Sequence, residues 1–353
     1  MILKELSEAF GVSGAEDEVR QLILCHINEH ADEVNVDALG NILATRRGTG
    51  QHNMRVMVAA HMDEVGFMVV GHESDGTLKF RAVGGVHPSV MLSTRVVVGP
   101  KKLPGVVGVL PIHMAHEVGN FGKVVETKTL RVDIGVSSKE AAKRKAPVGT
   151  YMTFDTAFTE LGPTVRGKAF DDRAGCAALI ELFTGERFPF DLCAAFTVQE
   201  EVGLRGAGVA AYRFAPDVAF VLEGTVCNDL PQEPDEDKTP VTRLGHGPAI
   251  SVMDRSMIAD RRLVEHLVAT AKAHDIPYQF KAPGTGGTDA GAIHLAREGI
   301  PSAVVSVPCR YIHGPAAILS LQDYENAVRL MREALLALEP SVGGGSTPRH
   351  DGP

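Results

Sequence analysis

The sequence predicts an α/β protein built on a mixed, mostly parallel sheet that helices cover, with a β-rich insertion. Three observations support this prediction. After residue 165, single apolar runs alternate with amphipathic helices, which is typical of parallel strands joined by helical crossovers. Between residues 67 and 164, short β-like runs alternate with glycine turns instead. The first 66 residues again combine helix and strand patterns, so we assign residues 1–66 and 165–340 to one α/β domain.

The N-terminal segment supplies a helix, a hairpin and a buried strand. Over residues 16–30 apolar side chains recur on one helical face. These side chains are Val19, Leu22, Ile23 and Ile27. Alternating apolar residues over 34–44, with a turn at 37–41, predict a hairpin. The continuous apolar run at 55–60 is typical of a strand that is buried on both faces.

The insertion at 67–164 contains short strand candidates separated by turns. The candidates are residues 67–70, 95–98, 105–110, 130–134 and 151–154. Within the insertion, only residues 138–145 show a helical pattern. We therefore expect a small β-rich domain with one short helix.

The segment after residue 165 predicts most of the parallel sheet. Helical periodicity covers residues 172–186, 260–274 and 321–338. The strand candidates are residues 191–198, 217–222, 248–253 and 301–307. The end of the chain, residues 341–353, has three consecutive glycines and a polar, proline-containing stretch, which predicts a disordered tail.

Composition and charge argue against several classes of protein. The formal net charge of −9 argues against a nucleic-acid partner, because phosphate binding needs a basic face. The longest apolar runs are far too short to cross a bilayer, and the N-terminus shows no signal-peptide pattern. Five scattered cysteines without a CxxC pair fit reduced thiols better than a disulfide scaffold. We expect a cytoplasmic protein with no membrane partner.

Histidines and carboxylates gather where the strands are expected to end. These residues are His61, Asp63, Asp171, Glu200, Glu201, Glu223 and His313. All of them except Asp171 lie at or just beyond the end of an expected strand, and Asp171 opens a helix. In open α/β sheets, ligands bind beyond the carboxyl ends of the strands. We therefore expect these side chains to meet at one edge of the sheet.

This set of side chains indicates a metal site. Imidazoles mixed with carboxylates suit Zn²⁺, Co²⁺ or Mn²⁺ better than Ca²⁺ or Mg²⁺. Two such ions need a carboxylate that bridges them. The adjacent Glu200 and Glu201 could divide two tasks, one binding metal and the other carrying a proton from water to a leaving amine. Asp63 could accept a hydrogen bond from His61 and orient its ring.

Each residue also has an ordinary structural interpretation. A histidine near a strand end is often a surface residue, a pair of glutamates is often solvated, and Asp171 could cap a helix. Glu223 fits this interpretation less well, because a carboxylate that ends an apolar run is partly buried and needs a partner. The glycine-rich segment 284–289 could cradle a phosphate. Its spacing differs from that of a P-loop, which favours a turn that leads into a helix at 289–297.

Six segments carry a resemblance to a known family. They are FGVSGAE at 10–16, AHMDEVGF at 60–67, FDDRAG at 170–175, VQEEVG at 198–203, GTDA at 287–290 and RYIH at 310–313. In this order they resemble motifs of the tetrahedral (TET) aminopeptidases, a group that includes glutamyl and deblocking aminopeptidases. The similarity runs from about residue 5 to about residue 338. Several ordered motifs along the whole chain make this resemblance specific.

The resemblance implies a role for each candidate residue. The ligands would be His61 and Glu223 for one metal ion and Glu201 and His313 for the other, with Asp171 as the bridge. Glu200 would be the general base, and Asp63 would orient His61. In the family the position of Glu223 is often Asp; the longer side chain keeps the carboxylate and leaves the ligation geometry and the metal preference open.

The resemblance also implies a fold and an assembly. The α/β peptidase domain would carry a β-barrel-like insertion that mediates dimerisation. Six dimers would form a hollow dodecamer, so that only short peptides reach the sites. The preferred N-terminal residue stays open, although Arg255, Lys281 and Arg310 could reach an acidic side chain.

Two other functions compete with a metallo-aminopeptidase. Some relatives of the family carry an endoglucanase label, but glycosidases use a pair of carboxylates without metal, whereas this set contains two histidines. A non-catalytic metal-binding scaffold is the second alternative. Glu200 argues against it, because this residue resembles no metal ligand and has no evident structural need.

Overall fold

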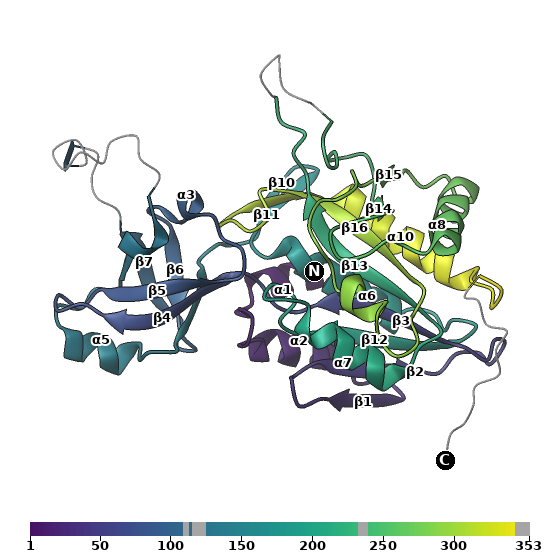
Figure 1. Cartoon of the computed structure of the whole chain (residues 1–353), viewed down its shortest axis with the longest axis horizontal. Coiled ribbons are helices and arrows are strands. Elements are labelled where there is room, and N and C mark those ends of the chain that lie inside the picture. Colours follow the sequence, from purple (N-terminus) through teal and green to yellow (C-terminus); the bar gives the residue numbers. More distant parts are fainter. Residues whose placement is uncertain (109–112, 115–124, 232–238, 343–353) are drawn as a thin grey trace.

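The larger lobe of the molecule is built on a mixed eleven-stranded sheet (Figure 1). The computed structural model describes residues 1–108, 113–114, 125–231 and 239–342. The sheet strands are β1 (Glu33–Val36), β2 (Ile42–Arg46), β3 (Arg55–His61), β10 (Thr159–Leu161), β11 (Thr164–Gly167), β12 (Asp191–Thr197), β13 (Val218–Val226), β14 (Ala249–Ser251), β15 (Gln279–Phe280), β16 (Ser302–Arg310) and β17 (Ala317–Ser320). Their order is β1-β2-β12-β3-β13-β16-β17-β11-β10, with β14 and β15 attached through β16.

The middle of this sheet is parallel and its margins are antiparallel. Strands β12, β3, β13 and β16 pair in parallel, whereas β1, β2, β17, β11 and β10 pair antiparallel. Parallel pairing aligns the carboxyl ends of the four middle strands along one edge. The predicted α/β fold class is confirmed.

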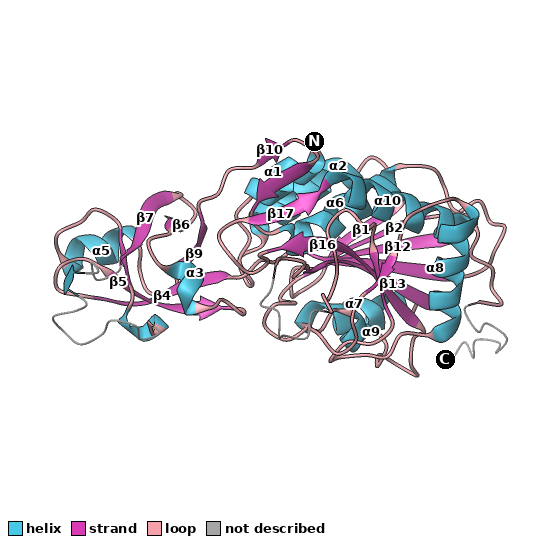
Figure 2. Ribbon diagram, turned by 90° about the horizontal axis from the view of Figure 1, so that it is seen from above, coloured by secondary structure: helices cyan, strands magenta, loops and turns pink. Residues whose placement is uncertain are grey.

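Helices cover both faces of the sheet (Figure 2). One face packs against α1 (Ile2–Glu8), α2 (Asp17–Ile27), α6 (Phe170–Thr184), α8 (Arg261–Ala273) and α10 (Leu321–Leu336). The other face packs against α7 (Arg205–Phe214) and α9 (Ala290–Ile293). Strand β3 shows why both faces must be covered, because its side chains alternate between the two cores. Val56, Val58 and Ala60 join the first core, and Met57 and Ala59 join the second.

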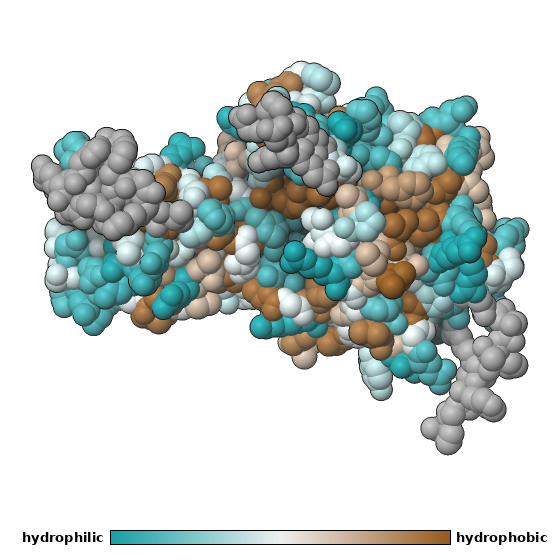
Figure 3. Space-filling model, turned by 45° about the horizontal axis from the view of Figure 1, so that its top comes forward, coloured by the Kyte–Doolittle hydropathy of each residue, from teal (hydrophilic) through white to brown (hydrophobic). Residues whose placement is uncertain are grey.

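The smaller lobe is a closed six-stranded barrel. Its strands are β4 (Gly66–His72), β5 (Leu78–Val83), β6 (Arg95–Val98), β7 (Leu103–Gly108), β8 (Arg131–Asp133) and β9 (Tyr151–Phe154), and its helical segments are α3 (Pro88–Met91), η1 (Thr127–Thr129) and α5 (Lys139–Lys145). Phe67 lies in the barrel core and makes edge-on ring contacts with Phe80 at 5.2 Å and with Phe154 at 5.3 Å. Outside the grey atoms, the visible face of this lobe is mainly hydrophilic, and hydrophobic residues gather on the larger lobe (Figure 3).

Some local predictions differ from the structure. The helix expected at 289–297 is reduced to the single turn α9, and α7 was not expected at all. The short helix expected at 138–145 is confirmed as α5. The domain boundaries at 66/67 and 164/165 stay predictions, and residues 343–353 of the predicted tail lie outside the described residues.

The structure also bears on the predicted thiols and on membrane-spanning helices. All five cysteines are free thiols, four of them buried and Cys25 exposed. Within the described ranges, no helix is long and apolar enough to cross a membrane.

Candidate metal centre

The carboxyl-end edge of the parallel strands collects the predicted side chains. His61 is the last residue of β3, and Glu200 and Glu201 lie three and four residues beyond the end of β12. Glu223 lies within β13, and His313 lies in the loop between β16 and β17. These strands are far apart in the sequence but lie side by side and run in the same direction, so their carboxyl ends meet at one edge of the sheet.

Five side chains form two overlapping groups that could each hold a metal ion. One group is His61, Asp171 and Glu223, and the other is Asp171, Glu201 and His313. In each group the ligand atoms lie within 4.8 Å of one another. Asp171, near the start of α6, belongs to both groups. Asp171, which was predicted to bridge two ions, is therefore the one residue that both candidate groups share.

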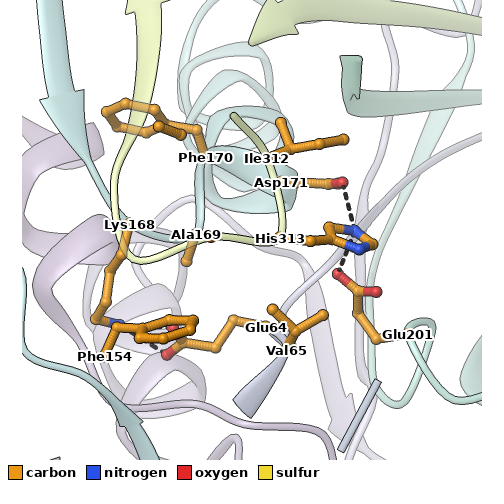
Figure 4. A pocket seen from close by; sticks show the side chains of 12 residues that line it. Glu64, Val65, Phe154, Lys168, Ala169, Phe170, Asp171, Glu201, Ile312 and His313 are labelled. Atoms are coloured by element: carbon orange, nitrogen blue, oxygen red, sulfur yellow. Dashed lines mark hydrogen bonds and ion pairs between the residues drawn. The ribbon is translucent and has the colours of Figure 1, made fainter. Parts of the chain in front are cut away.

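Each carboxylate oxygen of Asp171 faces a different histidine. Oδ1 is 3.3 Å from Nε2 of His61, and Oδ2 is 3.3 Å from Nε2 of His313. His61 Nε2 is also 3.5 Å from Oε2 of Glu223, and His313 Nε2 is 3.2 Å from Oε1 of Glu201. Figure 4 shows His313 between the carboxylates of Asp171 and Glu201.

The burial of Glu223 tests whether these residues fit metal ions. Glu223 is 4% exposed, and its Oε1 atom has no hydrogen-bond partner among the described residues. Burial raises the pKa of this carboxyl to about 8, although His61 opposes the shift. A buried carboxylate without a partner is costly unless a cation lies beside it. Nitrogen and oxygen donors together match the ligand preference of Zn²⁺ and similar ions, so the residues fit divalent metals.

The two histidines respond to the same excess of negative charge. Burial disfavours the charged form of His313, but Asp171 and Glu201 outweigh it and raise its pKa to about 11. The pKa of His61 is also raised, because Glu223 and Asp171 outweigh its complete burial. Without metal, these contacts therefore favour the imidazolium form of both rings. A bound cation would take the place of these charges and leave both rings neutral, as metal ligation requires.

Glu200 lies at the centre but outside both ligand groups of the described residues. Its Oε2 atom is 4.0 Å from Nε2 of His61, and its side chain is 11% exposed. Burial raises the pKa of the carboxyl to about 11, and Glu223 adds to this shift while His61 opposes it. A carboxyl with these properties can exchange a proton with a molecule bound in front of it.

Asp63 links His61 to the backbone that carries the two glutamates. Its Oδ1 atom is 3.4 Å from Nδ1 of His61 and accepts a hydrogen bond from the Glu200 backbone N–H at 2.9 Å. Its Oδ2 atom accepts hydrogen bonds from the Glu201 backbone N–H at 3.1 Å and from the Ser13 hydroxyl at 2.6 Å. Despite complete burial, these contacts lower the pKa of Asp63. The side chain is thus placed to hold the ring and the loop together.

A cavity of about 490 Å³ opens in front of the centre. Lys281 and residues 285–288 line it together with the ligand side chains. The lining includes Lys281, which is 4% exposed, but neither Arg255 nor Arg310. The side chain of Arg310 instead binds Asp229 through two hydrogen bonds of 2.7 and 2.9 Å.

Sequence comparison places this chain in a known family. The family model for M42 glutamyl aminopeptidases matches residues 40–330. The chain belongs to the M42 peptidase family. A candidate aminopeptidase of Acetivibrio thermocellus is 39% identical over 95% of this chain and 97% of that protein. The lysyl aminopeptidase of Pyrococcus furiosus is 35% identical, with 96% and 97% covered, and the glutamyl aminopeptidase of Lactococcus lactis is 32% identical, with 95% of each covered.

Solved structures agree with this assignment to the M42 family. A TET aminopeptidase from a marine sediment archaeon of the Thaumarchaeota shares 38% identity at a TM-score of 0.91, with 98% of each chain covered. The TET1 peptidase of Pyrococcus horikoshii, described as assembling into a tetrahedron or an octahedral shell, shares 33% identity at 0.84, with 96% and 99% covered. A Thermotoga maritima protein named as an endoglucanase shares 36% identity at 0.79, with 97% of each covered. The predicted family resemblance is confirmed.

The sequence did not predict a buried ion network near the candidate metal centre, formed by Glu64, Lys168 and Arg173. Glu64 accepts hydrogen bonds from Lys168 Nζ at 2.7 and 2.9 Å, from the Thr153 hydroxyl at 2.7 Å and from the Gly11 backbone at 3.2 Å (Figure 4 shows the Lys168 pair). Arg173 completes the network at 3.4 Å. Burial lowers the pKa of Lys168 to about 8, although Glu64 opposes this. The only sequence signal is that Glu64 and Arg173 lie inside two of the recognised motifs.

Asp289 is a second buried carboxylate that the sequence did not single out. It is completely buried and accepts a short hydrogen bond from the Thr197 hydroxyl. Its Oδ1 atom has no partner among the described residues, and burial raises its pKa to about 6. The sequence placed Asp289 only in a glycine-rich turn, since the contact with Thr197 spans 92 positions.

Proposed function

We propose that this chain is a dinuclear metallo-aminopeptidase that removes N-terminal residues from short peptides. Family membership supports a peptidase, and the relatives named above support aminopeptidase activity. The observation that carries the two-metal mechanism is the pair of ligand groups that share Asp171, with Glu200 close by and outside both. The proposed metals are two divalent ions per subunit, Zn²⁺, Co²⁺ or Mn²⁺.

The proposed ligands divide between the two ions. His61 and Glu223 would hold one ion, Glu201 and His313 the other, and Asp171 both. Bound there, the ions would supply Lewis acidity and lower the pKa of a water molecule. The rest of the chemistry belongs to side chains of the protein.

Glu200 is the proposed general base. Its carboxyl group takes a proton from the attacking water and gives it to the leaving amine. Positive charge in the two ligand groups would lower its pKa from the high value of the metal-free chain, because an opposite charge favours the carboxylate form. Asp63 keeps the His61 ring in the orientation in which Nε2 faces Asp171 and Glu223.

The surplus of carboxylates supports the choice of a free N-terminus. Asp171, Glu200, Glu201 and Glu223 all line the cavity. A protonated or metal-bound α-amine is favoured in such surroundings, whereas an acetylated amine loses the interaction and adds bulk. Losing one buried charged contact costs about 2–5 kcal/mol, which is well over tenfold in kcat/KM.

The test compares a short peptide with its N-acetylated twin, with products identified by mass spectrometry. We expect stepwise loss of single residues from the free peptide and much slower reaction of the acetylated one. A chelator should abolish the activity, and cellulose should not be hydrolysed, which separates this proposal from an endoglucanase. Internal cleavage of both peptides at similar rates would show that the enzyme is not an aminopeptidase.

The side-chain preference is proposed from Lys281. Its side chain has no hydrogen bond or ion pair among the described residues, although it is almost fully buried at the cavity wall. An ammonium group on such a side chain, without a partner in the protein, favours an anionic ligand. Arg310 is already bound by Asp229, so Lys281 is the proposed contact for an acidic side chain of the substrate. The family alone does not decide this, since one relative is named a lysyl aminopeptidase.

We also propose an assembly for this chain. Solved relatives whose names mention a dodecamer and a tetrahedron support a dodecamer here. We propose that it is built from dimers, with the insertion at 67–164 as the dimer contact. Light scattering at micromolar protein tests this, and a monomer would contradict it. A cytoplasmic location stays a prediction.

A further inference from the structure

The two candidate histidine ligands are anchored in the same way by different parts of the chain. In each ring Nδ1 faces a backbone carbonyl, which can only accept a hydrogen bond, so Nδ1 carries the proton and Nε2 is left for a metal. For His61 the carbonyl belongs to Asp63 at 3.1 Å, two residues along the same loop. For His313 it belongs to Gly85 at 3.0 Å, which is 228 positions away in the sequence.

Gly85 comes from the barrel lobe. It lies just after β5, in the segment that leads to α3. His313 depends more on such an anchor than His61 does. The His313 side chain is 34% exposed, whereas that of His61 is 2% exposed and is also held by the Asp63 carboxylate. Without the carbonyl of Gly85, the His313 ring would keep contacts only with the carboxylates of Asp171 and Glu201 among the polar groups described.

The neighbouring Gly84 fits tightly against the same metal group. Its φ angle is +80°, in the region that favours glycine. A Cβ atom at this position would lie 2.8 Å from Cγ1 of Val65 and 3.3 Å from Cβ of Glu201. The barrel segment therefore contacts two candidate ligands. Gly84 lies against the Cβ atom of Glu201, and the Gly85 carbonyl faces the ring of His313.

We propose that the Gly85 carbonyl is a positioning group for the metal ion that Asp171, Glu201 and His313 hold, so that the barrel lobe completes this half of the centre. The proposal rests on the two-metal function proposed above. It gives the insertion a role inside each subunit, in addition to any role in assembly. The other half, at His61 and Glu223, takes its histidine anchor from Asp63 in the α/β lobe.

The test is Gly84→Ala. We expect the strained φ angle and the added Cβ atom to shift the segment and to move the Gly85 carbonyl away from His313. Metal-free full-length protein is titrated with Zn²⁺ and with Co²⁺ by calorimetry, and bound metal is counted by emission spectroscopy after dialysis. Wild type should bind two ions per chain. The variant should keep one ion at wild-type affinity and bind the other about 10- to 100-fold more weakly, the usual loss for a group that orients a metal-bound histidine. When less than two equivalents of Co²⁺ are added to the variant, its visible spectrum should show only one of the two Co²⁺ environments.

Gly76→Ala is the matched control. Gly76 lies at the other end of β5, has a φ angle of +95°, and an added Cβ atom would lie 2.5 Å from the Val136 carbonyl oxygen. It strains the barrel at least as strongly but leaves Gly85 in place, so both ions should bind as in wild type. Equal loss of the second ion in both variants would refute positioning by Gly85 and indicate general damage to the barrel.

Two further outcomes separate this inference from the proposed function. Two ions bound with unchanged affinity by Gly84→Ala would overturn the role of Gly85 alone. A wild-type protein that binds fewer than two ions would instead overturn the two-metal proposal. If Gly84→Ala does not fold, the double variant with Val65→Ala removes the nearest clash, and it is compared with Val65→Ala alone. The strained φ angle, which displaces the Gly85 carbonyl, remains in the double variant, so its second ion should still bind more weakly.

Discussion

Glu200→Gln should separate the base from the ligands. The substitution preserves the shape of the side chain, and the hydrogen bond that Glu200 makes with Asp63 uses the backbone N–H, which is unaffected. The carboxyl lies 4.0 Å from His61 Nε2 and belongs to neither ligand group of the described residues. Both metal ions should therefore stay bound, while the group that carries the proton is lost.

The expected loss in kcat is about 10²- to 10⁴-fold, the usual contribution of a general acid–base. At about 1.36 kcal/mol for each factor of ten, this is about 2.7–5.4 kcal/mol in the activation free energy. The neighbouring substitution Glu201→Gln has the same chemistry and is the matched control. Because Glu201 Oε1 lies 3.2 Å from His313 Nε2 inside a ligand group, this variant should lose affinity for one ion.

The assay reads metal content by emission spectroscopy beside turnover of an aminoacyl-p-nitroanilide at saturating substrate. Glu200→Gln should show two ions and low kcat, and Glu201→Gln fewer than two ions. Near-wild-type turnover of Glu200→Gln would remove this residue from the mechanism. Loss of metal from Glu200→Gln would make it a ligand instead.

Three further predictions concern specificity, stability and pH. Lys281→Met should lower kcat/KM for a glutamyl substrate by at least ~30-fold, equivalent to about 2 kcal/mol for a buried charged contact, and leave kcat/KM for a leucyl substrate nearly unchanged. Lys272→Met, at an exposed position, is the control. An equal loss on both substrates would refute the specificity role of Lys281. Glu64→Gln should lower the free energy of unfolding in urea by about 3–5 kcal/mol, because Lys168 stays buried without its counter-charge, whereas Glu18→Gln at an exposed pair should cost under ~1 kcal/mol. In the metal-free protein Asp171 and Glu201 raise the pKa of His313 from an ordinary 6.5 to about 11. The stabilisation of the fold by the charged ring is therefore complete below pH 6.5 and is lost as the pH rises through 11. The melting temperature should fall over this range, and a rise would contradict the charge balance assigned to the centre.

The local pattern of the sequence predicted most of the sheet and the strand ends. The apolar run at 55–60 became β3, and His61 lies at its end as expected. The helix α7 was missed because its buried face, apart from Phe214, consists of small residues such as Ala207 and Ala210, which give a weak apolar signal. The helix expected at 289–297 was too long, since only one turn forms after Asp289.

Interactions between distant segments were beyond the reach of such patterns. Arg310 looked available to a substrate, but Asp229 binds it from 81 positions away. Lys281 looked no different from Arg255 in the sequence, yet only Lys281 of the two lines the cavity. A pattern with a period of two or 3.6 residues reports which face of an element is buried, and it carries no information about which other element lies against that face.

The sequence by itself therefore determined the fold class, the family and the kinds of side chain at the carboxyl-end edge, because alternation along a strand and the direction of parallel strands are local and general properties. Only the tertiary structure decided how these side chains are arranged. It turned the two oxygens of Asp171 toward two different histidines, and it brought Gly85 of the barrel to His313. These contacts depend on how the crossovers and the two lobes pack, and that packing is set by the whole core.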